Sequence, residues 1–174
     1  FTILTMDDEL ENALIVYGTQ DDEVGNHEAA RLLQTALRRR EHNVQPPIKS
    51  DREVSEEDLR GHHLLLVGRP STNAVSQRVA AKWPVDFGAQ SFAVRGQRYT
   101  HPESAVLAAG DNPLNPRYSA VLIAGLGSLG TYQIVGKFSD ELLGYAPVVV
   151  VPFGREPREL SPPLAELTLQ PVFR

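Results

Sequence analysis

Short runs of apolar residues recur along the chain and predict buried β-strands. The clearest runs are residues 13–17, 63–67, 104–109, 118–124 and 147–151. Most of these runs are apolar at nearly every position and do not alternate with polar residues. This pattern is typical of strands in a parallel sheet whose two faces are both covered by other elements.

Between the strands, apolar residues return at helical spacing. An amphipathic helix that ends near residue 41 is predicted by five of them, Ala29, Leu32, Leu33, Ala36 and Leu37. An acidic loop, residues 20–26, precedes this helix. A second helical face, formed by Val75, Val79 and Trp83, ends at Pro84, because proline cannot continue a helix.

Shorter signals fill the remaining segments. The glycine-rich residues 125–130 lead into a third helix, which extends to about residue 143. Ser55 and Asp58 have the spacing of a capping box and start a brief helix. Residues 91–95 and 98–100 flank Gly96 and Gln97, and a glycine first in a two-residue loop predicts a type II′ hairpin.

The order of these elements predicts the fold class. Strand, loop and helix follow one another three times, which indicates an α/β protein. We expect a three-layer sandwich with a mostly parallel, mixed sheet, similar to flavodoxin or Rossmann folds. A single domain is predicted over residues 1–156, followed by a proline-rich extended tail over residues 157–174. Such folds bind ligands at the carboxyl ends of their strands, so the loops at 18–26, 68–73 and 125–131 hold the candidate site.

Charge and composition exclude several classes of function. The formal net charge is −5, and 14 acidic but only 7 basic residues lie at or before Arg60. This balance argues against a nucleic-acid partner, which requires clustered lysine and arginine. The chain has no cysteine, which excludes thiol nucleophiles and cysteine-bound zinc. No apolar run approaches the ~20 residues of a membrane-spanning helix, so we expect no membrane insertion. The first residue is Phe1, and we expect the chain to be part of a longer polypeptide.

The glycine-rich loop is the main candidate for ligand binding. Residues 125–130 match the pattern G-x-G-x-x-G after a strand and at the start of a helix, where backbone N–H groups can hold a phosphate. The alternative is a tight turn that packs the helix on the sheet. Ser71, Thr72 and Asn73, which precede the second helix, either cap that helix or join the same anion site. The candidate anion-binding residues are therefore Thr19, Asn26, Ser71, Thr72, Asn73, Gly125, Gly127, Ser128 and Gly130.

Catalytic and metal-binding patterns are weak. Ser128 lacks the first glycine of a nucleophile elbow, because Leu126 stands there, and every histidine precedes it in the chain. His62 and His63 face opposite sides of a strand and cannot easily share a metal. We therefore predict no catalytic residue, no metal site and no cofactor in this chain. A further hypothesis places a divalent cation among Asp21, Asp22, Asp111 and Asn112, whose oxygens suit Mg²⁺.

Two resemblances add functional expectations. The run from Tyr17 to Gln20, with Gly25 and Asn26 after it, resembles the first loop of flavodoxins. This resemblance implies that Thr19, Gln20 and Asn26 surround the phosphate of FMN. Here the loop is longer by residues 21–24, and its three carboxylates would repel a phosphate by about 1 kcal/mol each.

The second resemblance is to accessory domains of secreted or envelope bacterial hydrolases, including prolyl-oligopeptidase-like and M1-type peptidases. The segments that carry it are residues 14–19, 65–73 and 112–118. It implies a non-catalytic accessory module, packed against a preceding catalytic domain of the same polypeptide and secreted or periplasmic. An apolar surface patch is expected where that domain docks. The alternative is a nucleotide- or flavin-binding domain that uses the strand-end glycine loops.

Overall fold

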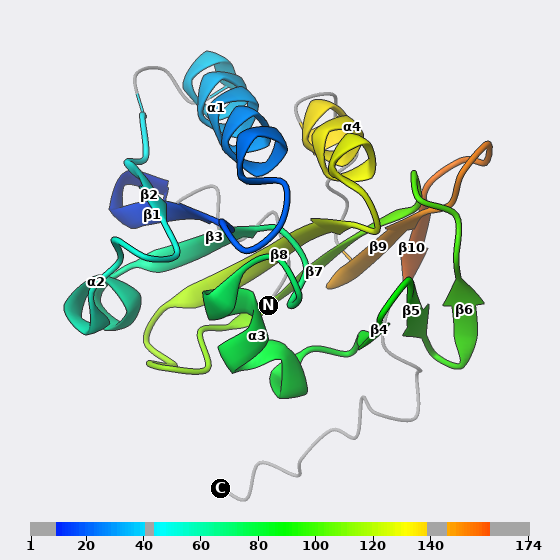
Figure 1. Ribbon diagram of the computed structural model, residues 1–174. Helices are drawn as coiled ribbons and strands as arrows, with labels where there is room; N and C mark the ends of the chain where they lie inside the picture. Colours follow the sequence, from blue (N-terminus) through cyan, green and yellow to red (C-terminus); the bar gives the residue numbers. More distant parts are fainter. Residues whose placement is uncertain (1–9, 41–43, 139–145, 161–174) are drawn as a thin grey trace, which may run out of the picture.

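The computed structural model describes residues 10–40, 44–138 and 146–160 (Figure 1). Its main sheet has seven strands in the order β10-β9-β7-β8-β3-β1-β2. In chain order they are β1 (Ala13–Tyr17), β2 (Ile48–Ser50), β3 (His63–Val67), β7 (Ala105–Asp111), β8 (Ser119–Gly125), β9 (Val148–Val151) and β10 (Arg158–Leu160). The five apolar runs of the sequence correspond to β1, β3, β7, β8 and β9.

The sheet has a parallel half and an antiparallel half. Strands β2, β1, β3 and β8 are parallel to one another, with Ile15 opposite both Ile48 and Leu65. Strand β7 runs antiparallel to both β8 and β9, and β10 runs antiparallel to β9. The predicted α/β class with a mixed sheet is confirmed, but the parallel pairing is confined to one half.

Four α-helices and a second, small sheet complete the described residues. The helices are α1 (Glu23–Arg40), α2 (Glu56–Gly61), α3 (Ala74–Val79) and α4 (Ser128–Phe138), and the 3-10 turn η2 (Ala80–Lys82) extends α3. The small antiparallel sheet contains β4 (Asp86–Gly88), β5 (Ser91–Val94) and β6 (Gln97–Tyr99). None of these helices combines the length and apolar character that a membrane-spanning helix needs.

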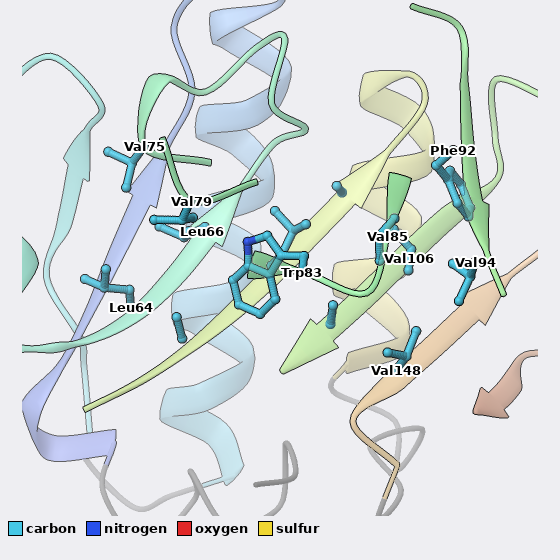
Figure 2. Close-up of a cluster of buried hydrophobic side chains, with 14 of the residues drawn as sticks. Leu64, Leu66, Val75, Val79, Trp83, Val85, Phe92, Val94, Val106 and Val148 are labelled. Carbon is cyan, nitrogen blue, oxygen red and sulfur yellow. The ribbon is translucent and has the colours of Figure 1, made fainter. Parts of the chain in front are cut away.

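The main sheet is covered on both faces (Figure 1). Helices α1 and α4 lie on one face, where Leu33 and Ile134 pack against Ile15, Leu65 and other strand residues in one buried cluster. The opposite face carries α2, α3 and the small sheet. Figure 2 shows the second cluster, whose side chains come from β3, α3, β5, β7 and β9. Burial on both faces explains why these strands are apolar along their whole length.

The hairpin turn differs from the prediction. Val94 pairs with Gln97, so the two loop residues are Arg95 and Gly96 rather than Gly96 and Gln97. Both have positive φ, 50° and 78°, which defines a type I′ turn and not type II′. The predicted turn was wrong because the strand register, and not the glycine alone, decides which residues form the loop.

Helix boundaries also differ in part. Helix α1 begins at Glu23, inside the predicted acidic loop, because the Asp22 carboxylate accepts a hydrogen bond from the Gly25 N–H at 3.1 Å and caps the helix. The capping box of α2 is confirmed, since Ser55 accepts from the Asp58 N–H. The predicted end of the third helix and most of the predicted tail lie outside the described residues. Within the tail, Arg158–Leu160 forms β10 at the edge of the main sheet.

Candidate functional site

A pocket lies where the direction of chain progression across the sheet reverses. From β1 the chain passes through α1 to β2 on one side, and then through α2 to β3 on the other side. The carboxyl ends of β1 and β3 at such a reversal form the usual ligand crevice of open α/β sheets. A pocket of about 280 Å³ occupies this position. It is lined by the loops after β1, β3 and β8, the same three loops that the sequence indicates.

The loop after β1 contributes two carboxylates and one buried amide. Asp21 and Asp22 line the pocket and are exposed to solvent. Asn26 is buried and lines it too, but its Nδ2 donates to the carbonyl oxygens of Gly18 and Asp21 at 3.1 and 3.2 Å. The amide therefore holds the loop in shape, and the carboxylates give this side of the pocket negative charge.

Thr19 belongs to a different network. Its hydroxyl donates to Asp51 Oδ1 at 2.7 Å, and Asp51 Oδ2 accepts from the Ala74 N–H at 2.8 Å. Asp51 thus joins the end of β1 to the start of α3. Thr19 does not line the pocket, and sequence reasoning did not single out Asp51, which has no motif around it.

The loop after β3 is held by Asn73, which is fully buried. Its Nδ2 donates to the carbonyl oxygens of Val16 and Val67, each at 3.0 Å, and its Oδ1 accepts from Val75 and Ser76. Asn73 therefore caps α3, which is the first of the two roles considered for it, and its side-chain nitrogen and oxygen are both occupied by these hydrogen bonds. Thr72 lines the pocket, whereas Ser71 is exposed and does not. Arg69, which sequence analysis did not select, supplies the positive charge of the pocket.

The glycine-rich loop after β8 makes close backbone contacts. A Cβ on Gly125 would collide with the Thr131 backbone, and Cβ atoms on Gly127 and Gly130 would lie 3.3 and 3.1 Å from the Pro102 carbonyl oxygen. The Gly127 N–H donates to that same oxygen at 2.8 Å. The glycines are therefore explained by packing of the turn and of α4. Gly125, Gly127 and Ser128 still line the pocket, and Gly130 does not.

The charges in the pocket oppose one another. Arg69 and the amino-terminal end of α4 favour an anion, whereas Asp21 and Asp22 disfavour it. In the part of the chain that the structure describes, no histidine, lysine or tyrosine lines the pocket, so none of these residues offers Ser128 a base there. The arrangement is a small polar crevice without a nucleophile–histidine pair.

The hypothesis of a divalent cation site fails on topology. Asp111 pairs with Ser119 at the first residue of β8, and Asn112 donates to the Leu59 carbonyl oxygen at 2.8 Å. Asp21 and Asp22 lie near the last residue of β8, at the opposite end of the strand. Within the described ranges, no three histidine, aspartate or glutamate side chains lie close enough to hold a metal ion.

Exposed apolar side chains lie on the same helices that border the pocket. Val24 in the first turn of α1 is 76% exposed, and Leu129 and Tyr132 at the start of α4 are 52% and 45% exposed. A Cβ on Gly25 would lie 2.7 Å from Ser128 Cβ, so the two first turns adjoin. Sequence analysis missed these residues. A sequence signal was available, because Leu129 and Tyr132 do not share the helical face of Thr131, Ile134 and Val135, which is buried.

Comparison with known proteins gives no relative: no protein-family model matches the chain, and no curated protein sequence is significantly similar to it.

Proposed function

We propose that this domain is a non-catalytic interaction module, which docks another protein domain on the first turns of α1 and α4. The observation that carries the proposal is the exposure of Val24, Leu129 and Tyr132 on these two adjoining turns. We call these three residues the helix-start patch. Grouped exposed apolar side chains are typical of protein–protein contacts, and tyrosine is enriched among residues that dominate binding energy.

The hydrogen bonds at the strand ends support the same proposal. Thr19, Asn26 and Asn73 were candidates for ligand binding, yet each donates a hydrogen bond to another part of the protein. These bonds make the loops a rigid platform beneath the helix-start patch. A rigid platform suits docking, because little conformational entropy is lost on association.

For the partner, we propose the catalytic domain of a larger bacterial hydrolase of the peptidase type, preceding this domain in the same polypeptide. The resemblance of residues 14–19, 65–73 and 112–118 to such accessory domains supports it. Under this proposal the chain is secreted or periplasmic and has no hydrolytic activity alone. We also infer a three-layer architecture related to flavodoxin and Rossmann folds, which the parallel strands β2, β1, β3 and β8 favour.

The test is site-specific cross-linking in cells that produce the natural polypeptide. A photoreactive side chain at Leu129 should cross-link to a hydrolase catalytic domain, and Tyr132→Asp or Val24→Asp should abolish the product. The matched control is the same probe at Arg117, which is exposed and precedes β8, whereas the helix-start patch lies beyond the other end of that strand. Equal cross-linking at both positions would contradict the proposal.

A second candidate function is binding of a nucleotide or flavin in the strand-end pocket. Arg69 and the amino-terminal end of α4 favour it, because both attract phosphate. Thermal denaturation with FMN, NAD, NADP or ATP tests it, since a ligand at 100 times its Kd stabilises the fold by about 2.7 kcal/mol. The informative variant is Arg69→Gln, because a side chain at Gly127 would press on Pro102 whatever the ligand. A stabilisation that Arg69→Gln removes would favour this candidate over docking.

A further inference from the structure

A second charged pocket lies between the edges of the two sheets. Strand β6 is an edge of the small sheet, and β10 is an edge of the main sheet (Figure 1). A hollow of about 260 Å³ lies between them. We call it the β6–β10 pocket. Its lining includes three arginines, Arg98 on β6, Arg155 in the β9–β10 loop and Arg158 on β10, together with the ring of His101. Among the residues that the structure describes, no aspartate or glutamate lines it.

The three guanidinium groups are not neutralised by partners within the described residues. The ion pairs found there involve Arg31, Lys49, Arg60 and Arg78, and none involves an arginine of the β6–β10 pocket. The closest carboxylates in sequence are Glu103, Glu156 and Glu159. Glu103 accepts from Gln133 at 3.2 Å, and Glu103 and Glu156 both line a neighbouring hollow, which Arg155 also borders. Three guanidinium groups therefore border one pocket, and none of them forms an ion pair with another described residue.

One wall of the pocket is aromatic and held in place. The rings of His101 and Phe153 stack with centroids 3.6 Å apart and an angle of 9° between their planes. The Phe153 N–H donates to Ser104 Oγ at 3.2 Å, and the Ser104 N–H donates to the His101 carbonyl oxygen at 2.8 Å. This stacked pair gives the pocket a flat aromatic side next to the arginine side chains.

We propose that the β6–β10 pocket binds a small phosphorylated ligand through its diphosphate group. Several adjacent anionic oxygens are needed to match three guanidinium groups, and the planar fork of arginine pairs with phosphate through two parallel hydrogen bonds. A single carboxylate or a chloride ion would leave most of this charge unpaired. The opposing explanation is that Arg98 and Arg158 only protect two sheet edges from pairing with other chains, as edge-strand charges often do.

The test is calorimetric titration of the chain with inorganic pyrophosphate at low and at physiological salt. We expect saturable one-to-one binding whose affinity decreases with salt. The affinity should fall about tenfold in Arg98→Gln and in Arg158→Gln, and by a further factor of about ten in the double variant. The control is the double variant Arg38→Gln/Arg117→Gln, which removes the same charge from exposed positions outside the pocket and should bind as the wild type does.

Four results would overturn the proposal. The first is no saturable binding of pyrophosphate up to about 1 mM. The second is an equal loss of affinity in the control double variant, which would indicate only net charge. The third is tighter binding of a hexaglutamate peptide than of pyrophosphate, which would assign the pocket to an acidic protein partner. The fourth is unchanged binding together with increased light scattering in Arg98→Gln/Arg158→Gln, which would establish edge protection as the role of these arginines.

Discussion

Asn73 shows how much of the strand-end architecture depends on one side chain. Its amide nitrogen connects the carboxyl ends of β1 and β3 by donating to the carbonyl oxygens of Val16 and Val67, while its oxygen caps α3. Removing the side chain would take one buried donor from each carbonyl oxygen, although Val67 would keep the Gly18 N–H, and it would leave the first N–H groups of α3 without their cap.

We therefore expect Asn73→Ala to lower the free energy of unfolding by roughly 3 kcal/mol, from the lost cap and the two lost hydrogen bonds to buried carbonyl oxygens. Urea denaturation measures this loss. The matched control is Asn12→Ala, because the exposed Asn12 donates a single bond to the Gly61 carbonyl oxygen and should contribute less than about 1 kcal/mol. Similar losses for both variants would show that Asn73 does not hold the two strands together.

Asp58 predicts how stability depends on pH. Its carboxylate accepts from Lys49 at 2.7 Å and from the backbone N–H and hydroxyl of Ser55, each at 2.8 Å, and these bonds lower its pKa. A carboxyl whose pKa is lower in the folded state stabilises the fold above its unfolded pKa of about 4. This stabilisation is lost as the pH falls from about 4 toward the lowered pKa.

The variant Asp58→Asn should accordingly be less stable than the wild type at neutral pH, and the difference should shrink as the pH falls toward about 2. Urea denaturation over this pH range measures the difference. Glu57→Gln is the control, because the exposed neighbour has no ion pair or hydrogen bond among those found in the described residues. A difference between wild type and Asp58→Asn that stays constant with pH would contradict the assignment.

At the scale of elements, the β5–β6 hairpin depends on backbone conformation. Gly96 has a φ of 78°, which side-chain-bearing residues adopt at a cost, whereas Gly136 lies within α4 with open space around its Cβ position. Gly96→Ala should destabilise the protein by about 1 kcal/mol, and Gly136→Ala should stabilise it by about 0.5–1 kcal/mol. Thermal denaturation of the two variants tests whether one substitution lowers and the other raises the stability of the protein. Destabilisation by both substitutions would show that glycine is needed in α4 for another reason.

Local patterns predicted individual elements well, and long-range pairing was harder to predict. The runs at β1 and β3 and the capping box at Ser55 are defined by neighbouring residues, so the sequence alone indicates them. The antiparallel half of the sheet depends on which strand β7 meets, and no local pattern specifies that neighbour. The site followed the same division. The three loops were predicted correctly as neighbours, but the partners of Thr19 and Asn73 come from distant segments.

At the scale of the whole molecule, the small sheet is part of the core. Phe92 on β5 is fully buried and stacks on Tyr99 with centroids 4.9 Å apart. It belongs to the cluster that includes Leu66, Val106 and Val148 (Figure 2). Together with α3, the hairpin covers one face of the main sheet.

This packing predicts that the small sheet unfolds with the rest of the domain. Phe92→Ala should lower the free energy of unfolding by about 3–5 kcal/mol, while the protein keeps a single cooperative transition. Phe87→Ala is the matched control, because Phe87 on β4 is only partly buried at the edge of the same cluster and should cost less. Backbone amides of β5 should exchange with solvent only through global unfolding, because the core that Phe92 completes cannot open locally without exposing both sheets. Early exchange of β5, or two separate transitions in Phe92→Ala, would mean that the main sheet is stable without this cover.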